Sequence, residues 1–379
     1  MKRKPGEVRD AIISALSNYP GGASVSEIES SVGSLVGDVP ASSIRSYLRL
    51  NTPETFVRSE RGRYQLREET INGYAVTPQR VQPPRFEYNN ASLINSDCID
   101  WLTGQPPNSI HAVVTDPPYG LIEYTDNQQE KMRRGSGGVW RVPPSFDGTK
   151  RAPLPRFTVL TNKDLLALSD FFLTWARALN PVLVPGANVV VASNPLLSYV
   201  ISSALAMAGL ERRGEIVRLV MTMRGGDRPK HAHVEFDGVS VMPRSMWEPW
   251  LVFRKPIEGR VQDNLRKWRT GGFRRPSDER PFGDVITSAP THKSERALAP
   301  HPSLKPQAFL RQVVRAVLPL GEGTVLDPFA GSGSTLAAAE AVGYRSIGTE
   351  RDPQYFKLAC AALPKLAAFK KTANYALDL

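Results

Sequence analysis

Cysteine is scarce in this chain, and long apolar runs are missing. The only cysteines among its 379 residues are Cys98 and Cys360, which are too few for a disulfide framework or for a zinc site made of cysteines. No run approaches the roughly eighteen apolar residues of a membrane-spanning helix, and residues 1–30 lack the apolar stretch of a signal peptide. These absences favour a protein of the reduced, intracellular compartment.

Acidic residues are fewer than basic residues in this chain. The chain has 48 Lys and Arg against 37 Asp and Glu, a net charge of +11. Residues 1–67 hold ten basic and seven acidic side chains (+3), and residues 211–300 hold eighteen and twelve (+6). A basic excess that clusters in turn-rich segments favours a polyanionic partner, and nucleic acid in particular.

The first 67 residues have the pattern of a small helical domain that ends in a β-hairpin. Apolar residues recur at helical spacing in Glu7–Ser17, a second helix follows the capping residue Ser24 or Ser26, and a third begins after Pro40. Two strand-like runs then flank a turn at 60–63. This order is typical of a winged helix-turn-helix domain. Such domains bind DNA or protein, and both uses stay open here.

Beyond residue 67 the pattern changes to alternating strands and helices. The polar segment 68–90 carries three prolines and no helical period, so we predict a linker there. The alternation that follows predicts an α/β fold with a mostly parallel sheet. The stretch from 223 to 299 is basic and irregular in pattern. The predicted strands are 91–94, 112–115, 187–192, 215–222, 324–326 and 345–348, and the predicted helices are 164–178, 195–207, 334–342 and 355–362.

One apolar strand ends in an acid, Asp327, and enters a turn that contains Gly331 and Gly333. Glycines let a ligand approach the backbone, and Glu350, at the end of the next predicted strand, suits the two hydroxyls of a ribose. Leu336 stands where a dinucleotide-binding fingerprint has its third glycine. The turn therefore disfavours a pyrophosphate, and with it an NAD-dependent oxidoreductase. It favours a nucleoside cofactor without phosphates.

A second motif, Asp116-Pro117-Pro118-Tyr119, follows the predicted strand 112–115 directly. In a parallel sheet, ligand sites gather at the carboxyl ends of the strands. The two prolines provide carbonyl acceptors and no N–H donors, so with the Asp116 carboxylate they form an acceptor surface that suits an NH₂ group. The ring of Tyr119 is flat enough for a planar base to stack on it.

Together these two motifs resemble those of the amino-methylating DNA methyltransferases, which transfer a methyl group from S-adenosylmethionine to an exocyclic amine. The Asp-Pro-Pro-Tyr motif precedes the glycine turn, with a long basic region between them, and this order resembles the beta group of the family. Ser96-Asp97, the turn at 185–186 and the segment 301–306 also match. The resemblance covers about residues 91–365. It implies a Rossmann-like methyltransferase fold for 91–379, with an inserted target-recognition region at about 224–300.

The resemblance also implies roles for individual residues, and it implies no metal. The catalytic residues would be Asp116, Pro117, Pro118 and Tyr119. The residues that would bind the cofactor are Asp97, Cys98, Asp116, His301, Ser303, Lys305, Asp327, Phe329, Ala330, Gly331, Ser332, Gly333, Ser334, Thr335, Glu350 and Arg351.

The reaction implied by the resemblance is methylation of adenine N6 in duplex DNA, with the base flipped out of the helix. The implied setting is the cytoplasm of a prokaryote or phage host, with a cognate restriction endonuclease and a second copy of the chain as candidate partners. In the family, Asp at the first position of this motif favours adenine and Ser favours cytosine, so Asp116 favours adenine. The alternatives are cytosine N4, the amine of an RNA base or free nucleotide, and a DNA-binding protein whose methyltransferase domain has decayed. The presence of all the expected acids opposes the last of these.

Overall fold

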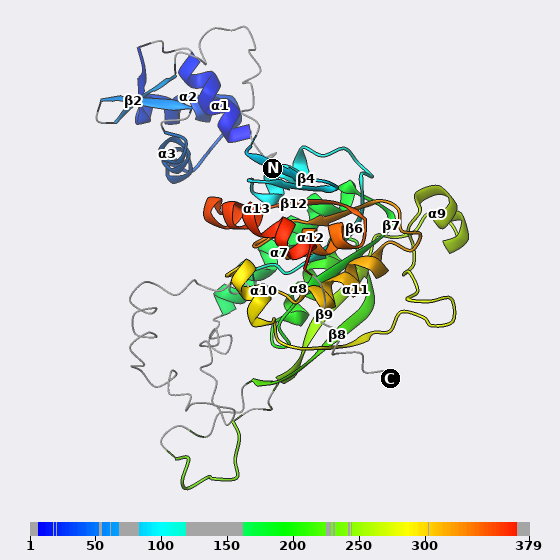
Figure 1. Ribbon diagram of the computed structural model, residues 1–379. Coiled ribbons are helices and arrows are strands. Elements are labelled where there is room, and N and C mark those ends of the chain that lie inside the picture. Colours follow the sequence, from blue (N-terminus) through cyan, green and yellow to red (C-terminus); the bar gives the residue numbers. More distant parts are fainter. Residues whose placement is uncertain are drawn as a thin grey trace. The chain divides into compact units, whose positions relative to one another are not determined.

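The computed structural model describes residues 7–17, 19, 21–52, 55–60, 62–67, 83–118, 162–224, 229, 232–241, 243, 245–301 and 303–369. The chain forms two compact units, Met1–Gln82 and Pro83–Leu379 (Figure 1). Each unit has a hydrophobic core of its own.

The first unit packs three helices against a small antiparallel sheet. Its elements are α1 (Glu7–Ser17), β1 (Ala23–Ser24), α2 (Val25–Val36), α3 (Ala41–Leu50), β2 (Phe56–Glu60) and β3 (Arg63–Leu66), and the strand order is β1-β3-β2. Ser24 was one of the two expected capping residues. It caps α2 and forms a capping box with Glu27. Ile12, Ile28 and Leu48, one from each helix, are fully buried. The predicted helices and hairpin are therefore present, while the winged-helix assignment itself stays a prediction.

The second unit is an α/β domain around one large, mostly parallel sheet. Within the described residues the sheet has nine strands in the order β10-β8-β9-β7-β6-β11-β12-β5-β4, and only β9 and β4 run antiparallel to their neighbours. The strands are β4 (Arg85–Tyr88), β5 (Ala91–Ile94), β6 (Ile110–Thr115), β7 (Leu183–Ala192), β8 (Glu211–Arg224), β9 (Ser245–Arg254), β10 (Val285–Ser288), β11 (Thr324–Asp327) and β12 (Arg345–Thr349). The predicted α/β class is confirmed.

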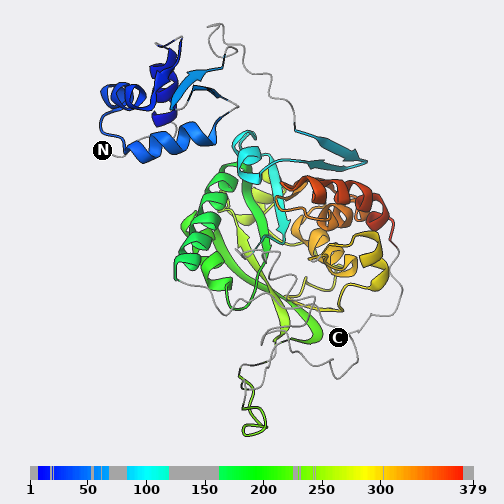
Figure 2. The ribbon, with the colours of Figure 1, turned by 90° about the vertical axis from the view of Figure 1, so that its left-hand side faces the viewer.

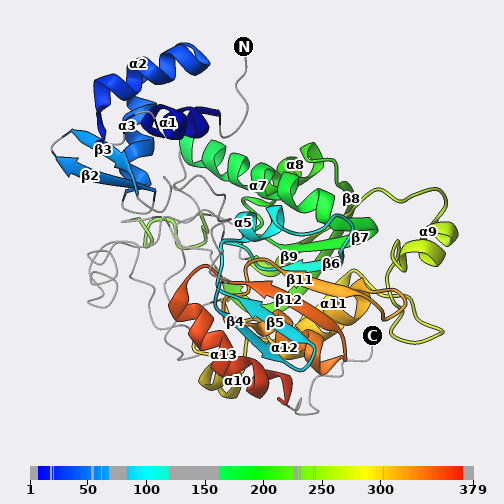
Figure 3. The same ribbon diagram turned by 90° about the horizontal axis from the view of Figure 1, so that it is seen from above.

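Helices cover both faces of this sheet. They are α5 (Cys98–Thr103), α7 (Asn162–Val182), α8 (Ser198–Met207), α9 (Val261–Trp268), α10 (Lys293–Leu298), α11 (Gln307–Val317), α12 (Ser334–Ala341) and α13 (Pro353–Ala367). Figures 2 and 3 show α7 and α8 on one face, and α11, α12 and α13 on the other. Successive side chains of β7 point to opposite faces of the sheet. Val189 and Val191 pack in the core with α7, and Val190 packs in the core with α11.

The sequence interpretation of two segments was wrong. The stretch 223–299, expected to be irregular, forms β9, α9, β10 and α10. Pro249 within β9 weakened the strand signal, but β9 pairs with the long neighbour β8 and buries Trp250 completely. Part of the region expected to read the target thus belongs to the large sheet. The expected linker 68–90 includes β4, which pairs with β5 around a turn where Asn89 has a φ of 47°.

Besides α9 and α10, two further helices of this unit, α5 and α11, were not predicted. The first is only six residues long, and the second follows directly on a proline-containing segment. In the part of the chain that the structure describes, no helix is both long and apolar enough to cross a membrane.

Candidate functional site

Four parallel strands end at the same edge of the sheet, and each end is followed by a polar segment. β5, β6, β11 and β12 are neighbours, and their registers pair Thr349 with Ile94 and Asp327 with Gly348. The segments that follow begin at Asn95, Asp116, Pro328 and Glu350. The fold therefore brings together the two motifs that the sequence placed at strand ends.

The glycine turn after β11 is tied to the end of β12. Gly331 and Gly333 have φ values of 52° and 74°, which residues with a side chain rarely adopt. The Gly331 N–H donates to Oε2 of Glu350 at 2.8 Å, and the Asp352 N–H donates to Oε1 at 2.8 Å. Burial raises the pKa of Glu350, while these two hydrogen bonds oppose the rise. Both carboxylate oxygens are thus held by backbone before any ligand arrives.

Asp327 connects the two motifs. Its Oδ1 accepts from the Thr115 hydroxyl at 2.6 Å, at the last residue of β6, and from the Phe329 N–H at 3.2 Å. The side chain is buried, and burial raises its pKa to about 6. Asp327 was expected to contact the cofactor, and in the structure it joins the strand before Asp116 to the glycine turn.

We expect Asp327→Asn to remove a pH-dependent loss of stability. The carboxyl has an ordinary pKa of 3.8 and a raised pKa of about 6 in the fold. The stability contributed by the protonated carboxyl is therefore fully present below pH 3.8 and is lost as pH rises through 6, at a cost of about 3 kcal/mol. Asn keeps the acceptor oxygen and does not titrate. In urea unfolding at a series of pH values, the free energy of unfolding of the variant relative to wild type should rise between about pH 4 and pH 7. A difference that is independent of pH would contradict this.

The segment after β5 presents Asp97 and buries Cys98. Asp97 caps α5, since its Oδ1 accepts from the Ile99 N–H at 2.9 Å, and its side chain is 36% exposed. Arg351 lies 3.9 Å from the other oxygen. Burial raises the pKa of Cys98 to about 12, so this thiol is not a nucleophile at neutral pH.

The segment 301–306 lies over the glycine turn. A Cβ placed on Gly331 would come within 3.1 Å of the His301 ring, which packs edge-on against Tyr355 at 4.5 Å between ring centroids. His301 Nδ1 accepts from the Ser303 N–H at 3.2 Å. Burial lowers the pKa of His301, and the imidazole is accordingly neutral at neutral pH. The expected contact residue His301 therefore lies beside the turn, together with Tyr355, which sequence reasoning missed.

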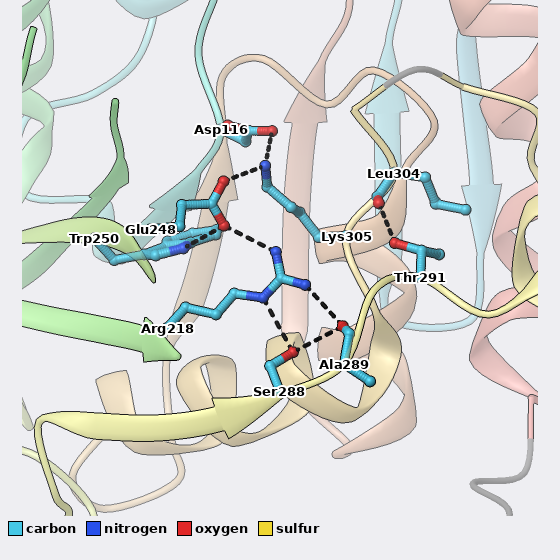
Figure 4. A network of polar contacts seen from close by, with 9 residues as sticks. All are labelled: Asp116, Arg218, Glu248, Trp250, Ser288, Ala289, Thr291, Leu304 and Lys305. Carbon is cyan, nitrogen blue, oxygen red and sulfur yellow. Dashed lines mark hydrogen bonds and ion pairs between the residues drawn. The ribbon is translucent and has the colours of Figure 1, made fainter. Parts of the chain in front are cut away.

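Asp116 belongs to a chain of alternating charges, shown in Figure 4. The Lys305 ammonium lies 2.9 Å from Oδ2 of Asp116 and 2.8 Å from Oε1 of Glu248. Oε2 of Glu248 accepts from Arg218 at 2.9 Å and from the Trp250 indole N–H at 3.4 Å. The Arg218 guanidinium also donates to Ser288 and to the carbonyl of Ala289, at 3.0 Å each. The ammonium of Lys305, a predicted cofactor contact, thus lies between Asp116 and Glu248.

The pKa shifts follow from this pairing. Burial opposes the charge of Glu248, but Lys305 and Arg218 outweigh it and lower its pKa to about 2. Burial likewise opposes the charge of Lys305, and the carboxylates of Asp116 and Glu248 raise its pKa overall. Glu248 and Lys305 are therefore both charged at neutral pH. Sequence reasoning missed Arg218 and Glu248 because neither belongs to a recognisable motif.

The other predicted residues divide by burial. Phe329 packs against Phe171 and Trp175, with ring centroids 6.0 and 5.5 Å apart. Pro118 and Arg351 are exposed. Tyr119 lies outside the described residues. No group of three or more His, Cys, Asp or Glu side chains that could hold a metal occurs within the described ranges. The predicted site residues that remain are all buried, and they are Pro117, Ala330, Ser332, Ser334 and Thr335.

Comparison with known proteins gives consistent matches. The DNA methylase family N6_N4_Mtase matches residues 110–361. The type II methyltransferase M2.LlaDCHI of Lactococcus lactis subsp. cremoris is 24% identical over 299 residues, covering 79% of this chain and 98% of the relative. The type II methyltransferase M2.DpnII of Streptococcus pneumoniae is 23% identical over 290 residues, covering 76% and 95%. Among solved structures, the PvuII DNA methyltransferase (cytosine-N4-specific) has 16% identity and a TM-score of 0.48, covering 76% of this chain and 90% of its own.

Proposed function

Because this chain belongs to the DNA methylase family of N6 and N4 amino-methyltransferases, we propose that it methylates the N6 amine of adenine at a specific site in duplex DNA, with S-adenosylmethionine as the methyl donor. The observation that carries the proposal is the junction of the two strand ends. Asp116 follows β6, the glycine turn follows β11, and the Thr115–Asp327 hydrogen bond of 2.6 Å joins them. A group that accepts an amine thus lies beside a turn suited to a nucleoside.

The residues at this edge fit S-adenosylmethionine in charge and in shape. Glu350, anchored at both oxygens, suits the ribose hydroxyls, and the partly exposed Asp97 suits the cationic end of the methionine moiety. Gly331 and Gly333 allow the tight turn, because both have a positive φ and a Cβ on either would meet protein atoms, His301 at 3.1 Å and Ala359 at 3.4 Å. When bound, the cofactor supplies a methyl group made electrophilic by the sulfonium.

The protein's part in the reaction is to orient and polarise the target amine. The lone pair of an adenine amine is delocalised into the ring, so the amine is a poor nucleophile. If Asp116 accepts one of its N–H groups, and the Pro117 carbonyl accepts the other, the lone pair is directed out of the ring plane. Neither proline offers a competing N–H donor. No covalent intermediate is needed, which agrees with the buried thiol of Cys98 and its pKa of about 12.

Adenine is favoured over cytosine by Asp116 itself, at the position where the resemblance has Asp for adenine and Ser for cytosine. The partners we propose are duplex DNA, a cognate restriction endonuclease and a second copy of the chain. The endonuclease follows from the relatives, which are named type II methyltransferases. The +6 charge of residues 211–300 supports contact with DNA.

Sequencing that reports modified bases tests the proposal directly. The full chain is expressed in a host that lacks DNA methylation, and the host DNA is sequenced. We expect N6-methyladenine at one short sequence. Detection of N4-methylcytosine instead would identify cytosine as the target base. An absence of methylated DNA, together with an absence of cofactor binding in calorimetry, would favour the non-catalytic alternative.

A deletion separates the roles of the two units. Residues 83–379 keep β4 and form one compact unit, so we expect them to fold and to methylate the same sequence as the full chain. If the first unit adds phosphate contacts, its loss should weaken DNA binding at low salt, and this difference should shrink as salt rises. Methylated sites and DNA affinity at two salt concentrations are the measurements. A changed target sequence would assign sequence reading to the first unit, and unchanged affinity at low salt would favour a protein-binding role.

A further inference from the structure

Two members of the charged chain at the catalytic edge, Arg218 and Glu248, lie outside both motifs. They come from β8 and β9, which pair with each other between the edge strand β10 and β7. Lys305 comes from the segment that also covers the glycine turn. The side chains of Arg218 and Lys305 are 7% and 12% exposed, and those of Asp116 and Glu248 are 15% and 20% exposed. The charged groups are therefore largely withdrawn from solvent, where their interactions are strong.

The position of Lys305 has a consequence for Asp116 as an acceptor. An ammonium that pairs with a carboxylate partly neutralises the charge of the carboxylate. The hydrogen bond that the carboxylate accepts from an incoming amine is therefore weaker. Here the same ammonium also lies 2.8 Å from Glu248, so that two carboxylates share one cation. Arg218 balances the second carboxylate at 2.9 Å. Because Glu248 shares the ammonium, Lys305 does not fully neutralise Asp116. The contact with Glu248 also fixes the position of Lys305, and thereby that of Asp116.

Fold stability alone is a poor reason for such an arrangement. Removing charges from water costs about as much as a buried ion pair returns, and apolar residues of the same volume often stabilise a fold equally well. The series of charged groups also ends on Asp116, the carboxylate to which the proposed function assigns the target amine. From this geometry we propose that Glu248 is a positioning residue for methyl transfer: it holds the Lys305 ammonium between two carboxylates and so fixes the orientation and acceptor strength of Asp116. This inference rests on the proposed function.

The test compares two Glu→Gln substitutions on the same pair of strands. Glu248→Gln removes the charge that shares Lys305. The matched control is Glu211→Gln, because Glu211 also pairs across β8 and β9, with Arg254 at 2.6 Å, at the opposite end of their pairing. A merely structural role predicts similar effects in both variants. A positioning role predicts that only Glu248→Gln slows methyl transfer.

We expect Glu248→Gln to lower the single-turnover rate of methyl transfer to DNA by about tenfold, which corresponds to about 1.4 kcal/mol in the barrier. The dissociation constants for S-adenosylmethionine and DNA should change by less than about twofold, because Glu248 contacts neither in the proposed arrangement. In an Asp116→Asn background the same substitution should have little further effect, since the group that it positions is already impaired. Glu211→Gln should leave the rate unchanged.

Thermal unfolding shows whether the variant folds. If Glu248→Gln does not, Glu248→Asp carries the test, because it keeps the charge but withdraws the carboxylate by one methylene. It should slow transfer by about threefold with cofactor affinity unchanged. A rate equal to that of Glu211→Gln, an effect confined to cofactor affinity, or full additivity with Asp116→Asn would overturn the inference. Failure of the proposed function is distinct, because it would appear as an absence of methyl transfer in the wild-type protein.

Discussion

Asp116→Ala is expected to reduce methyl transfer by about 100-fold or more while S-adenosylmethionine still binds. Asp116 is the charged acceptor proposed for the target amine, and alanine leaves the amine without it. The Lys305 ammonium keeps its contact with Glu248 at 2.8 Å, so the substitution does not leave an unpaired buried cation. The cofactor contacts proposed for Glu350 and Asp97 are also untouched.

Single-turnover transfer of labelled methyl groups to DNA measures this effect, and calorimetry measures cofactor affinity. Asp116→Asn is the isosteric companion, which keeps an acceptor oxygen without its charge and should fall between wild type and alanine. Asp100→Ala is the matched control, because Asp100 is exposed on α5. Methylation by a folded Asp116→Ala protein at close to the wild-type rate would contradict the mechanism.

Gly331→Val is expected to weaken S-adenosylmethionine binding by about 100-fold. A valine at a φ of 52° is strained by about 1–3 kcal/mol, and its Cβ would meet the His301 ring at 3.1 Å. Either the turn or the ring must move. Movement of the turn also disturbs the 2.8 Å hydrogen bond from the Gly331 N–H to Glu350, which orients the acid proposed for the ribose.

Calorimetric titration with the cofactor measures the loss. Gly283→Val serves as the control, since Gly283 is exposed and does not have a positive φ, and a Cβ added there would meet no heavy atom within 4 Å. Thermal unfolding of both variants separates a local effect from loss of the fold. Unchanged cofactor affinity in a folded Gly331→Val protein would place the cofactor elsewhere.

The sequence by itself determined the α/β class and the polar segments that follow the parallel strands. The reason is that these signals are local: an apolar run predicts a strand, glycines predict a turn with positive φ, and two prolines remove donors. Parallel strands place their carboxyl ends at one edge, so the meeting of Asp116 with the glycine turn followed from the sequence pattern. Asp327 and Glu350 were identified in the same way, whereas Asp97 was identified through the family resemblance.

Only the tertiary structure decided how β9 and its neighbours complete this edge. Pro249 concealed β9 from propensity arguments, and the strand exists because β7 and β8 pair with it on both sides. The contacts of Glu248 join residues 30 and 57 positions apart in the chain, with Arg218 and Lys305. No local pattern encodes which charges meet at such separations. Their pairing depends on strand register and on the burial that makes an unpaired charge costly, and both arise only when the sheet has formed.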